Sequence, residues 1–222
     1  MSQEPVSIAS QVDDLRATRV PNPVFTAEQD ALAKTSRALL VPLGSPFPDG
    51  DLTDASGRPT TLRAVLAGNP GVIIFYRGAW CPYCNIALRT YRDQLTVPLR
   101  EMGVRLVAIS PQTADGSMTM QEKLDLDFAV LSDPGNQIAG ALGILTHPSD
   151  DARAIQLEHG LDITTDNADG TTNLPMPTTA IINADGTLAW IDVHPDYTTR
   201  TEPAQILDAL NAILPTAEST RG

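Results

Sequence analysis

The sequence predicts an α/β fold in which helices cover both faces of a central β-sheet. Short apolar runs of β-type composition alternate with helical patterns along the chain, and this order implies a sheet with helices on both sides. The clearest case is the run at residues 71–77, which is followed directly by a long helical pattern at 81–102. Ala184-Asp185-Gly186, between two strand-like runs, is a hairpin signal that adds an antiparallel pair.

The predicted elements follow one another from about Leu52. Asp54-Ala-Ser-Gly57 indicates a turn, and residues 58–62 form the return strand of a hairpin. Further strands are expected at 72–76, 104–110, 129–131, 179–183 and 187–193, and helices at 61–66, 81–102, 118–124, 138–142 and 203–214. Residues 144–174 are polar and rich in Asp, so we expect a loop insertion with one helical turn there.

Residues 1–46 differ in character from the rest. Thr26-Ala-Glu-Gln29 has the pattern of a capping box and predicts a helix that runs to about Leu40. Prolines bracket this segment, as they bracket linkers. We therefore expect residues 1–46 to be a helical extension, 47–215 the main domain and 216–222 a flexible tail. Whether the extension packs on its own domain or on a second subunit stays open.

Composition narrows the class of protein. The 222 residues carry a net charge of −12, which argues against nucleic acids and anionic membrane surfaces as partners. The longest apolar run is far too short to cross a bilayer. The N-terminus has neither the basic nor the apolar region of a signal peptide. We therefore expect a cytoplasmic protein, where paired cysteines are more often catalytic than structural.

Cys81 and Cys84, the only cysteines of the chain, lie where a predicted strand ends and a helix begins. The partial positive charge and free N–H groups of a helix start favour a thiolate, which is the nucleophilic form of cysteine. Cysteines at positions i and i+3 are neighbours and can form a disulfide. The pair therefore predicts a reversible dithiol/disulfide redox centre.

Three other interpretations of the pair remain. A structural disulfide that closes so small a loop adds little stability. A zinc site needs about four ligands, and the three histidines have no metal-binding spacing to these cysteines. Two buried, inert thiols are the third alternative. We favour the redox centre and expect neither a metal nor a cofactor.

The segment Phe75-Tyr-Arg-Gly-Ala-Trp-Cys-Pro-Tyr-Cys84 resembles the active-site segment of the thioredoxin superfamily. Residues 107–110, 128–143 and 177–186 resemble the peroxiredoxin branch, the alkyl hydroperoxide reductase/thiol-specific antioxidant (AhpC/TSA) family. The resemblance covers residues 47–214 and implies a thioredoxin-like fold with a central mixed sheet. It also implies a thiol-dependent antioxidant oxidoreductase that reduces hydroperoxides or disulfides. A redox sensor or partner-binding module on the same fold is the alternative.

The two cysteines can be assigned opposite roles. Cys84 belongs to the apolar helical stripe that continues through Leu88, Tyr91 and Leu95, so helical phase predicts a buried Cys84 and an exposed, more acidic Cys81. Resemblance to thioredoxins likewise makes Cys81 the attacking thiol, whereas resemblance to peroxiredoxins gives that role to Cys84. We favour Cys81 as the nucleophile. Pro98 is expected to kink or interrupt the helix.

The resemblance also implies supporting residues. These are Trp80 beside the sulfurs, the Pro82-Tyr83 dipeptide that glutaredoxins share, Pro177 in a cis-proline turn, and Arg77. Arg77 could stabilise a thiolate or a peroxide oxygen, but we favour a solvated loop arginine, and we expect His194 to be a strand-end histidine. Resemblance to peroxiredoxins allows Arg200 to return toward the site, but we favour a surface salt bridge for it. A disulfide cycle needs an external thiol reductant, either glutathione or a thioredoxin-like protein. A homodimer remains open.

Overall fold

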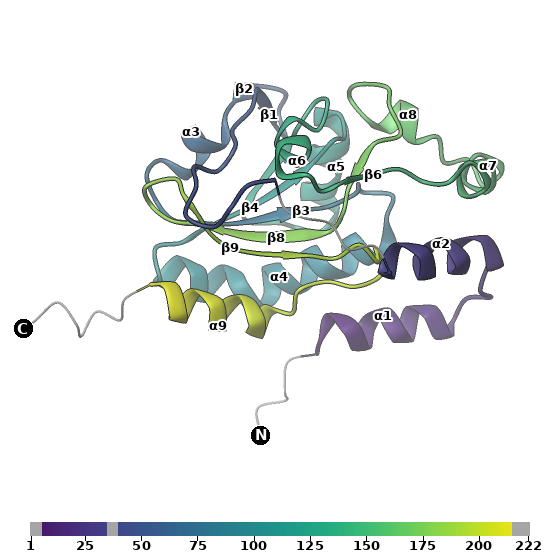
Figure 1. Cartoon of the computed structure of the whole chain (residues 1–222), viewed down its shortest axis with the longest axis horizontal. Helices are drawn as coiled ribbons and strands as arrows, with labels where there is room; N and C mark the ends of the chain where they lie inside the picture. The colour runs from purple at the N-terminus through teal and green to yellow at the C-terminus, as the bar shows by residue number, and fades with distance from the viewer. Residues whose placement is uncertain (1–5, 35–39, 215–222) are drawn as a thin grey trace, which may run out of the picture.

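The centre of the molecule is a seven-stranded mixed sheet (Figure 1). The computed structural model describes residues 6–34 and 40–214, and within them the strand order is β2-β1-β5-β4-β3-β8-β9. β3, β4 and β5 are parallel, and the other pairs are antiparallel, so the predicted mixed sheet is confirmed. The strands of the sheet are β1 (Leu52–Asp54), β2 (Pro59–Thr60), β3 (Gly71–Phe75), β4 (Arg105–Ser110), β5 (Ala129–Ser132), β8 (Thr178–Ile182) and β9 (Leu188–Val193).

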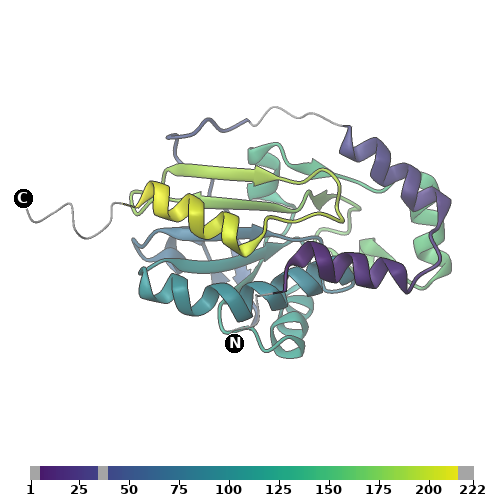
Figure 2. The same cartoon turned by 90° about the horizontal axis from the view of Figure 1, so that it is seen from below.

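Helices cover both faces of this sheet. The described helices are α1 (Ile8–Ala17), α2 (Pro23–Ala33), α3 (Leu62–Leu66), α4 (Pro82–Glu101), α5 (Ala114–Lys123), α6 (Gln137–Leu142), α7 (Asp150–Glu158), α8 (Ile163–Asp166) and α9 (Pro203–Ile213). Helices α4, α9 and α1 lie side by side on one face, as Figure 2 shows from below. Helices α3 and α6 pack on the opposite face. The expected two-sided α/β arrangement is therefore confirmed.

Strand β3 separates the two cores. Val72 and Ile74 face the core under α4, whereas Ile73 and Phe75 face the core under α3 and α6. Every residue of β3 is buried, so alternation of side chains buries apolar groups on both faces. This explains why the strand is a continuous apolar run in the sequence.

Helix α4 carries the stripe that the spacing predicts. Leu88, Tyr91, Leu95 and Leu99 are all buried against the sheet, together with Cys84. Cys81 is the N-cap residue and Pro82 occupies the first helical position, where a missing N–H group costs nothing. The helix continues through Pro98 to Glu101, so the predicted interruption is wrong. Pro98 lies in the last turn, so only a few helical residues follow it.

The N-terminal segment forms two helices rather than one. The unpredicted α1 buries Ile8 and Val12 against α4, and its Gln11 side chain donates to the Thr90 hydroxyl at 2.9 Å. Helix α2 begins at Pro23 because the Asn22 side chain caps it, so the predicted start at Thr26 is wrong. The end of the predicted helix falls on residues 35–39, outside the described residues. The extension packs on its own chain, but the proposed domain boundaries stay predictions.

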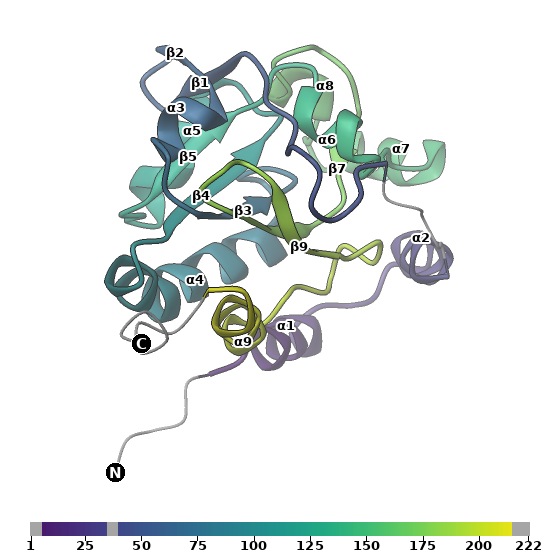
Figure 3. The same cartoon turned by 60° about the vertical axis from the view of Figure 1, so that its left-hand side comes forward.

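The polar segment at 144–174 is more ordered than predicted. It contains the small β6–β7 pair (Leu145–Thr146 with Leu174–Pro175) and helices α7 and α8. Ser149 caps α7 and Asp162 caps α8 through their side-chain oxygens. The prediction of a loop with one helical turn is wrong, since short helices with polar outer faces resemble loops in composition. Figure 3 shows α7 beside α2, at the edge of the molecule.

Truncation of a stripe residue of α4 is expected to destabilise the protein. Leu95 is fully buried, so Leu95→Ala leaves a cavity and should lower the free energy of unfolding by roughly 2–5 kcal/mol. Val97, two residues away, is 60% exposed, and Val97→Ala should change that free energy by less than about 0.5 kcal/mol. Urea denaturation of both variants measures the difference. Equal effects at the two positions would contradict this orientation of α4.

Candidate active site

The segment between β3 and α4 places both cysteines at the carboxyl end of the parallel strands. The Cys81 N–H donates to the Gly78 carbonyl at 3.1 Å, which closes a tight turn before the helix. The Ala79 N–H donates to the Gln112 side chain at 2.6 Å, which ties this turn to the loop after β4. A Cβ atom at Gly78 would lie 2.5 Å from Nε1 of Trp80, so this position requires glycine.

Both cysteines are buried free thiols. Cys84 is 0% exposed and Cys81 is 1% exposed, so the prediction of an exposed Cys81 is wrong. Helical phase identifies the face on which a residue lies, but it does not show what covers a residue at the helix start. Trp80 and Tyr83 pack over the core that contains the two thiols. Any reactant therefore reaches the sulfurs only when covering side chains move.

Arg200 contacts the sulfur of Cys84. Its Nη2 atom donates to Sγ at 3.1 Å, while Nη1 donates to the carbonyls of Tyr197 and Thr199 at 2.7 and 2.6 Å. The side chain is 8% exposed, so the predicted surface salt bridge is wrong. No carboxylate among residues 6–34 and 40–214 pairs with this guanidinium. A buried cation needs a counter-charge, and a Cys84 thiolate supplies one.

The two thiols differ strongly in acidity. Burial alone raises the pKa of Cys84, but the Cys81 hydrogen bond, the Arg200 charge and the Arg77 backbone N–H hold that pKa well below its usual range. Burial raises the pKa of Cys81, and the hydrogen bond to Cys84 and its charge raise it further. Cys84 is therefore the more acidic thiol of the pair, and the interaction between the two sulfurs favours the proton on Cys81.

Arg77 lies between aromatic rings rather than in solvent. It is 4% exposed, and its guanidinium carbon is 4.0 Å from the ring centroid of Tyr197 and 5.1 Å from that of Trp80. The preference for a solvated loop arginine is therefore wrong. The Tyr197 ring also meets the Tyr83 ring, with 6.5 Å between centroids. Arg77 and these three rings therefore pack together beside the cysteine segment.

A polar network holds the loop that carries Tyr197 and Arg200. His194, half-buried after β9, contacts the Asp192 carboxylate at 2.9 Å and the Thr199 hydroxyl at 2.8 Å. The Thr201 hydroxyl donates to the same carboxylate, and the Tyr91 hydroxyl of α4 donates to the Thr201 carbonyl at 2.7 Å. This loop is thereby fixed to α4 close to Cys84. His194 is a member of this network, beyond the strand-end role expected for it.

The N-terminal helices also hold this loop. The Glu202 carboxylate accepts from the backbone N–H groups of Ile8 and Ala9, at the start of α1, at 2.9 and 2.8 Å. From α2, Gln29 donates to the Tyr197 hydroxyl, which in turn donates to Glu28 at 3.1 Å. Glu28 also accepts from the Ser149 N–H of the α7 cap. Sequence reasoning missed these hydrogen bonds because their partners lie between 121 and 194 residues apart in the chain.

Pro177 differs from its prediction. No peptide bond in the described part of the chain is cis, so the Met176–Pro177 bond is trans. Pro177 is buried directly before β8, and its carbonyl accepts from the His194 N–H at 2.8 Å. This hydrogen bond continues the pairing between β8 and β9 by one residue, and it forms with the Met176–Pro177 bond in the trans state. Pro177 therefore supports the loop of His194 from the sheet side.

Residues 6–34 and 40–214 contain no group of three His, Cys, Asp or Glu side chains arranged to hold a metal ion. None of the helices in this same part of the chain has the length and apolar character needed to span a membrane.

Two proteins with sequences similar to this chain are chloroplastic peroxiredoxins Q. Peroxiredoxin Q of Sedum lineare chloroplasts is 31% identical over 126 residues, which cover 57% of this chain and 65% of the relative. The chloroplastic peroxiredoxin Q of Oryza sativa subsp. japonica is 28% identical over 141 residues, which cover 63% of this chain and 64% of the relative. The chain thus aligns with just under two thirds of the length of these relatives.

Solved structures share the fold. Peroxidoxin BcpB from Mycobacterium tuberculosis superposes with a TM-score of 0.59 at 22% identity, covering 79% of this chain and 99% of that one. Reduced Prx3 from Vibrio vulnificus, solved in complex with hydrogen peroxide, superposes with a TM-score of 0.62 at 19% identity. The match covers 77% of this chain and 99% of that one. The thioredoxin-like fold class is therefore confirmed. The model of the AhpC/TSA family matches residues 43–191, more than half of the chain, and the chain therefore belongs to the AhpC/TSA family.

Proposed function

We propose that this chain is a thiol-dependent peroxidase in which Cys84 attacks a hydroperoxide and Cys81 resolves the product. The contact between the buried Arg200 guanidinium and the Cys84 sulfur carries the proposal. A thiolate is the form of cysteine that attacks peroxides, and Cys84 is the thiol with the lowered pKa. This assignment reverses the one that the helical phase favours.

The first step is a displacement at oxygen. The Cys84 thiolate attacks the distal oxygen of ROOH, an S–O bond forms, and the O–O bond breaks. The alkoxide takes a proton from solvent and leaves as the alcohol, while Cys84 becomes a sulfenic acid. The Arg200 Nη2 group and the Arg77 backbone N–H, which both contact the sulfur, stay in place as hydrogen-bond donors.

The second step forms the disulfide. The Cys81 sulfur attacks the Cys84 sulfenic sulfur, an S–S bond forms, and water leaves with the Cys81 proton. The Cys84 charge, one cause of the raised pKa of Cys81, disappears once the sulfenic acid forms, while Arg77 and Arg200 remain nearby. Cys81 therefore becomes a better nucleophile at the stage that requires it. The sum of the two steps converts a dithiol and ROOH to a disulfide, ROH and water.

Burial of the site favours a small oxidant over a protein disulfide. Both sulfurs are buried, and Trp80 and Tyr83 pack against the core that contains them, so a bulky disulfide would have to displace these side chains. The cycle closes when an external thiol, glutathione or a thioredoxin-like protein, reduces the Cys81–Cys84 disulfide. We propose a cytoplasmic location and a cycle that needs no cofactor. A homodimer remains one of the possible states of the protein. Steady-state turnover with added reductant separates this enzyme from a sensor, which oxidises once and stops.

The two serine variants are expected to stop at different stages. Cys84→Ser should abolish rapid oxidation by hydrogen peroxide, because it removes the thiol that Arg200 contacts, and burial still raises the pKa of the remaining Cys81. Cys81→Ser should still react and should accumulate a Cys84 sulfenic acid that a dimedone probe traps. Wild type should instead lose two hydrogens within one peptide. Stopped-flow oxidation and mass spectrometry check this, and a sulfenic acid that forms only at Cys81 would reverse the assignment.

Arg200 is expected to set the acidity of Cys84. In the Cys81→Ser background, Arg200→Met should raise the pKa of Cys84, because a contacting positive charge is lost. The rate of reaction with iodoacetamide falls as the pH drops through that pKa, so the variant should lose reactivity at a higher pH. Arg200→Lys keeps the charge and should give a smaller shift. Identical pH profiles with and without the Arg200→Met change would rule out this role.

A further inference from the structure

One histidine contacts both chain neighbours of Arg200. The His194 imidazole contacts the Thr199 hydroxyl through Nδ1 at 2.8 Å and the Thr201 hydroxyl through Nε2 at 3.3 Å. The Thr199 carbonyl in turn accepts from Nη1 of Arg200 at 2.6 Å, while Nη2 donates to Sγ of Cys84. A continuous series of contacts therefore joins the imidazole to the sulfur, through Thr199 and the guanidinium.

The imidazole is fixed to the end of the sheet rather than to the loop. Its Nε2 atom lies 2.9 Å from the carboxylate of Asp192, a residue of β9. The backbone N–H of His194 donates to the Pro177 carbonyl, directly beyond the paired residues of β8 and β9. The ring is only 18% exposed, so it is a constrained support for the loop that carries Arg200.

The hydrogen-bond pattern determines which ring nitrogens carry hydrogens. The Thr199 hydroxyl has one hydrogen and donates it to the Asp196 carbonyl at 3.0 Å, because a carbonyl oxygen can only accept. In the contact with Nδ1 the hydroxyl oxygen must then be the acceptor, so Nδ1 carries a hydrogen. Nε2 faces a carboxylate oxygen and therefore carries a hydrogen as well. A ring with both hydrogens is an imidazolium cation.

The charges around the ring fit this cation. The Asp192 carboxylate pairs with it, and the hydrogen bond from His194 is the main reason why the pKa of Asp192 lies below its usual range. The other charged or titratable groups of the loop and of α4 have different partners or are neutral. These groups are Asp196, which binds Thr198, Glu202, which binds the start of α1, Arg200, which binds Cys84, and Tyr91, whose pKa is raised by burial.

We propose that His194 is a positioning residue for Cys84 and acts through Arg200. As an imidazolium paired with Asp192, it donates to Thr199 and so holds the guanidinium against the sulfur. Without the ring, or without its Nδ1 hydrogen, the loop loses this support, Arg200 leaves the sulfur more often, and Cys84 becomes less acidic. This inference rests on the proposed peroxidase function for its role in catalysis, but the acidity of Cys84 is measured without a peroxide.

Alkylation by iodoacetamide measures the effect in the Cys81→Ser background. The quantity compared is the rate at about one unit below the midpoint of the wild-type pH profile, divided by the plateau rate at high pH. This ratio reports acidity, because a change in access to the sulfur alters both rates equally. His194→Ala should lower it roughly three- to tenfold, the effect of one lost hydrogen bond. Thr199→Val removes the hydroxyl partner from an exposed side chain and should also lower it, even if His194→Ala fails to fold.

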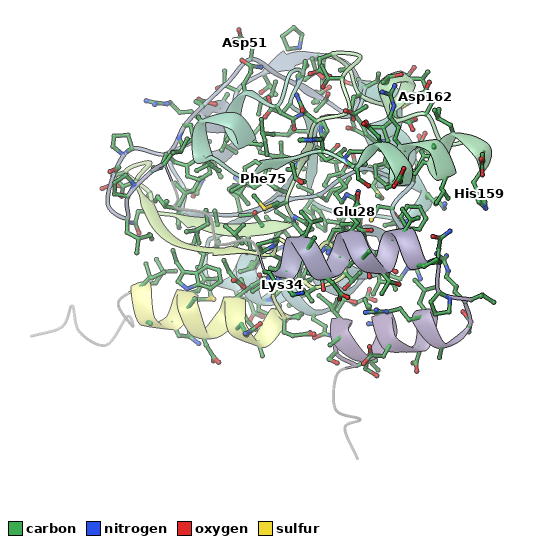
Figure 4. The ribbon with its side chains drawn as sticks, turned by 45° about the vertical axis from the view of Figure 1, so that its right-hand side comes forward. Glu28, Lys34, Asp51, Phe75, His159 and Asp162 are labelled. Carbon is green, nitrogen blue, oxygen red and sulfur yellow. The ribbon has the colours of Figure 1, made fainter. Side chains whose placement is uncertain are left out.

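His159→Ala is the matched control. His159 is an exposed histidine whose Nδ1 atom contacts the Ile155 carbonyl of its own helix, and Figure 4 shows it at the edge of the molecule, at the end of α7. Its replacement should leave the alkylation ratio as in wild type. Wild-type ratios in His194→Ala or in Thr199→Val would overturn the inference.

A second background separates positioning from general support of the fold. If His194 acts through Arg200, His194→Ala should produce no further fall of the ratio once Arg200→Met is present. A fall by the same factor in both backgrounds would show that the histidine does not act through the arginine, and the inference would be wrong.

Nitrogen-15 NMR of the ring tests the imidazolium independently. The two nitrogens of an imidazolium have similar chemical shifts, whereas those of a neutral ring differ widely. Wild-type His194 should show the imidazolium pattern under the conditions of the peroxide assay, and Asp192→Asn should move it toward the neutral pattern. A neutral ring in wild type would contradict the donor role of Nδ1.

This inference and the peroxidase proposal fail in different ways. If hydrogen peroxide leaves Cys84 reduced in the wild type, the peroxidase proposal fails, while the alkylation ratio still decides whether His194 acts through Arg200. If hydrogen peroxide oxidises Cys84 and His194→Ala keeps the wild-type ratio, only the positioning role fails.

Discussion

The hydrogen bond between Arg200 and Cys84 is the interaction on which the site depends. It places a guanidinium against a sulfur inside a core that water does not reach, and a buried charge is tolerated only when it is paired. The thiolate and the arginine therefore stabilise one another. Two backbone carbonyls and the network around Asp192 and His194 hold the arginine, so the acidity of Cys84 depends on a loop far along the chain.

The same contact makes two neighbouring thiols unequal. Cys81 and Cys84 share a helix start and the same degree of burial, and a helix dipole acts on both. Arg200 contacts only Cys84, and the Cys81 thiol donates to the thiolate that results. A small difference in position thus becomes a clear difference in acidity between the two thiols. The proposed sequence of steps follows from this inequality.

The N-terminal helices connect this chemistry to the surface. Glu202 binds the start of α1, and Glu28 and Gln29 of α2 hold the hydroxyl of Tyr197, so both helices act on the loop of Arg200. The α1–α2 connection also lines a cleft that reaches Arg77. A segment outside the family match therefore holds the loop that carries Tyr197 and Arg200.

The sequence by itself determined the α/β class, the presence of the buried strand β3, the stripe of α4 and the position of the cysteine pair at its start. These features depend on local periodicity and on residues that cap or begin helices, which a single segment contains. It did not reveal α1, the order in 144–174, the burial of Cys81 or the environments of Arg77 and Arg200. Each of those depends on partners distant in the chain. Only the tertiary structure brings Arg200 to Cys84, because the energy of a buried charge is decided by what packs around it, and no local pattern encodes that.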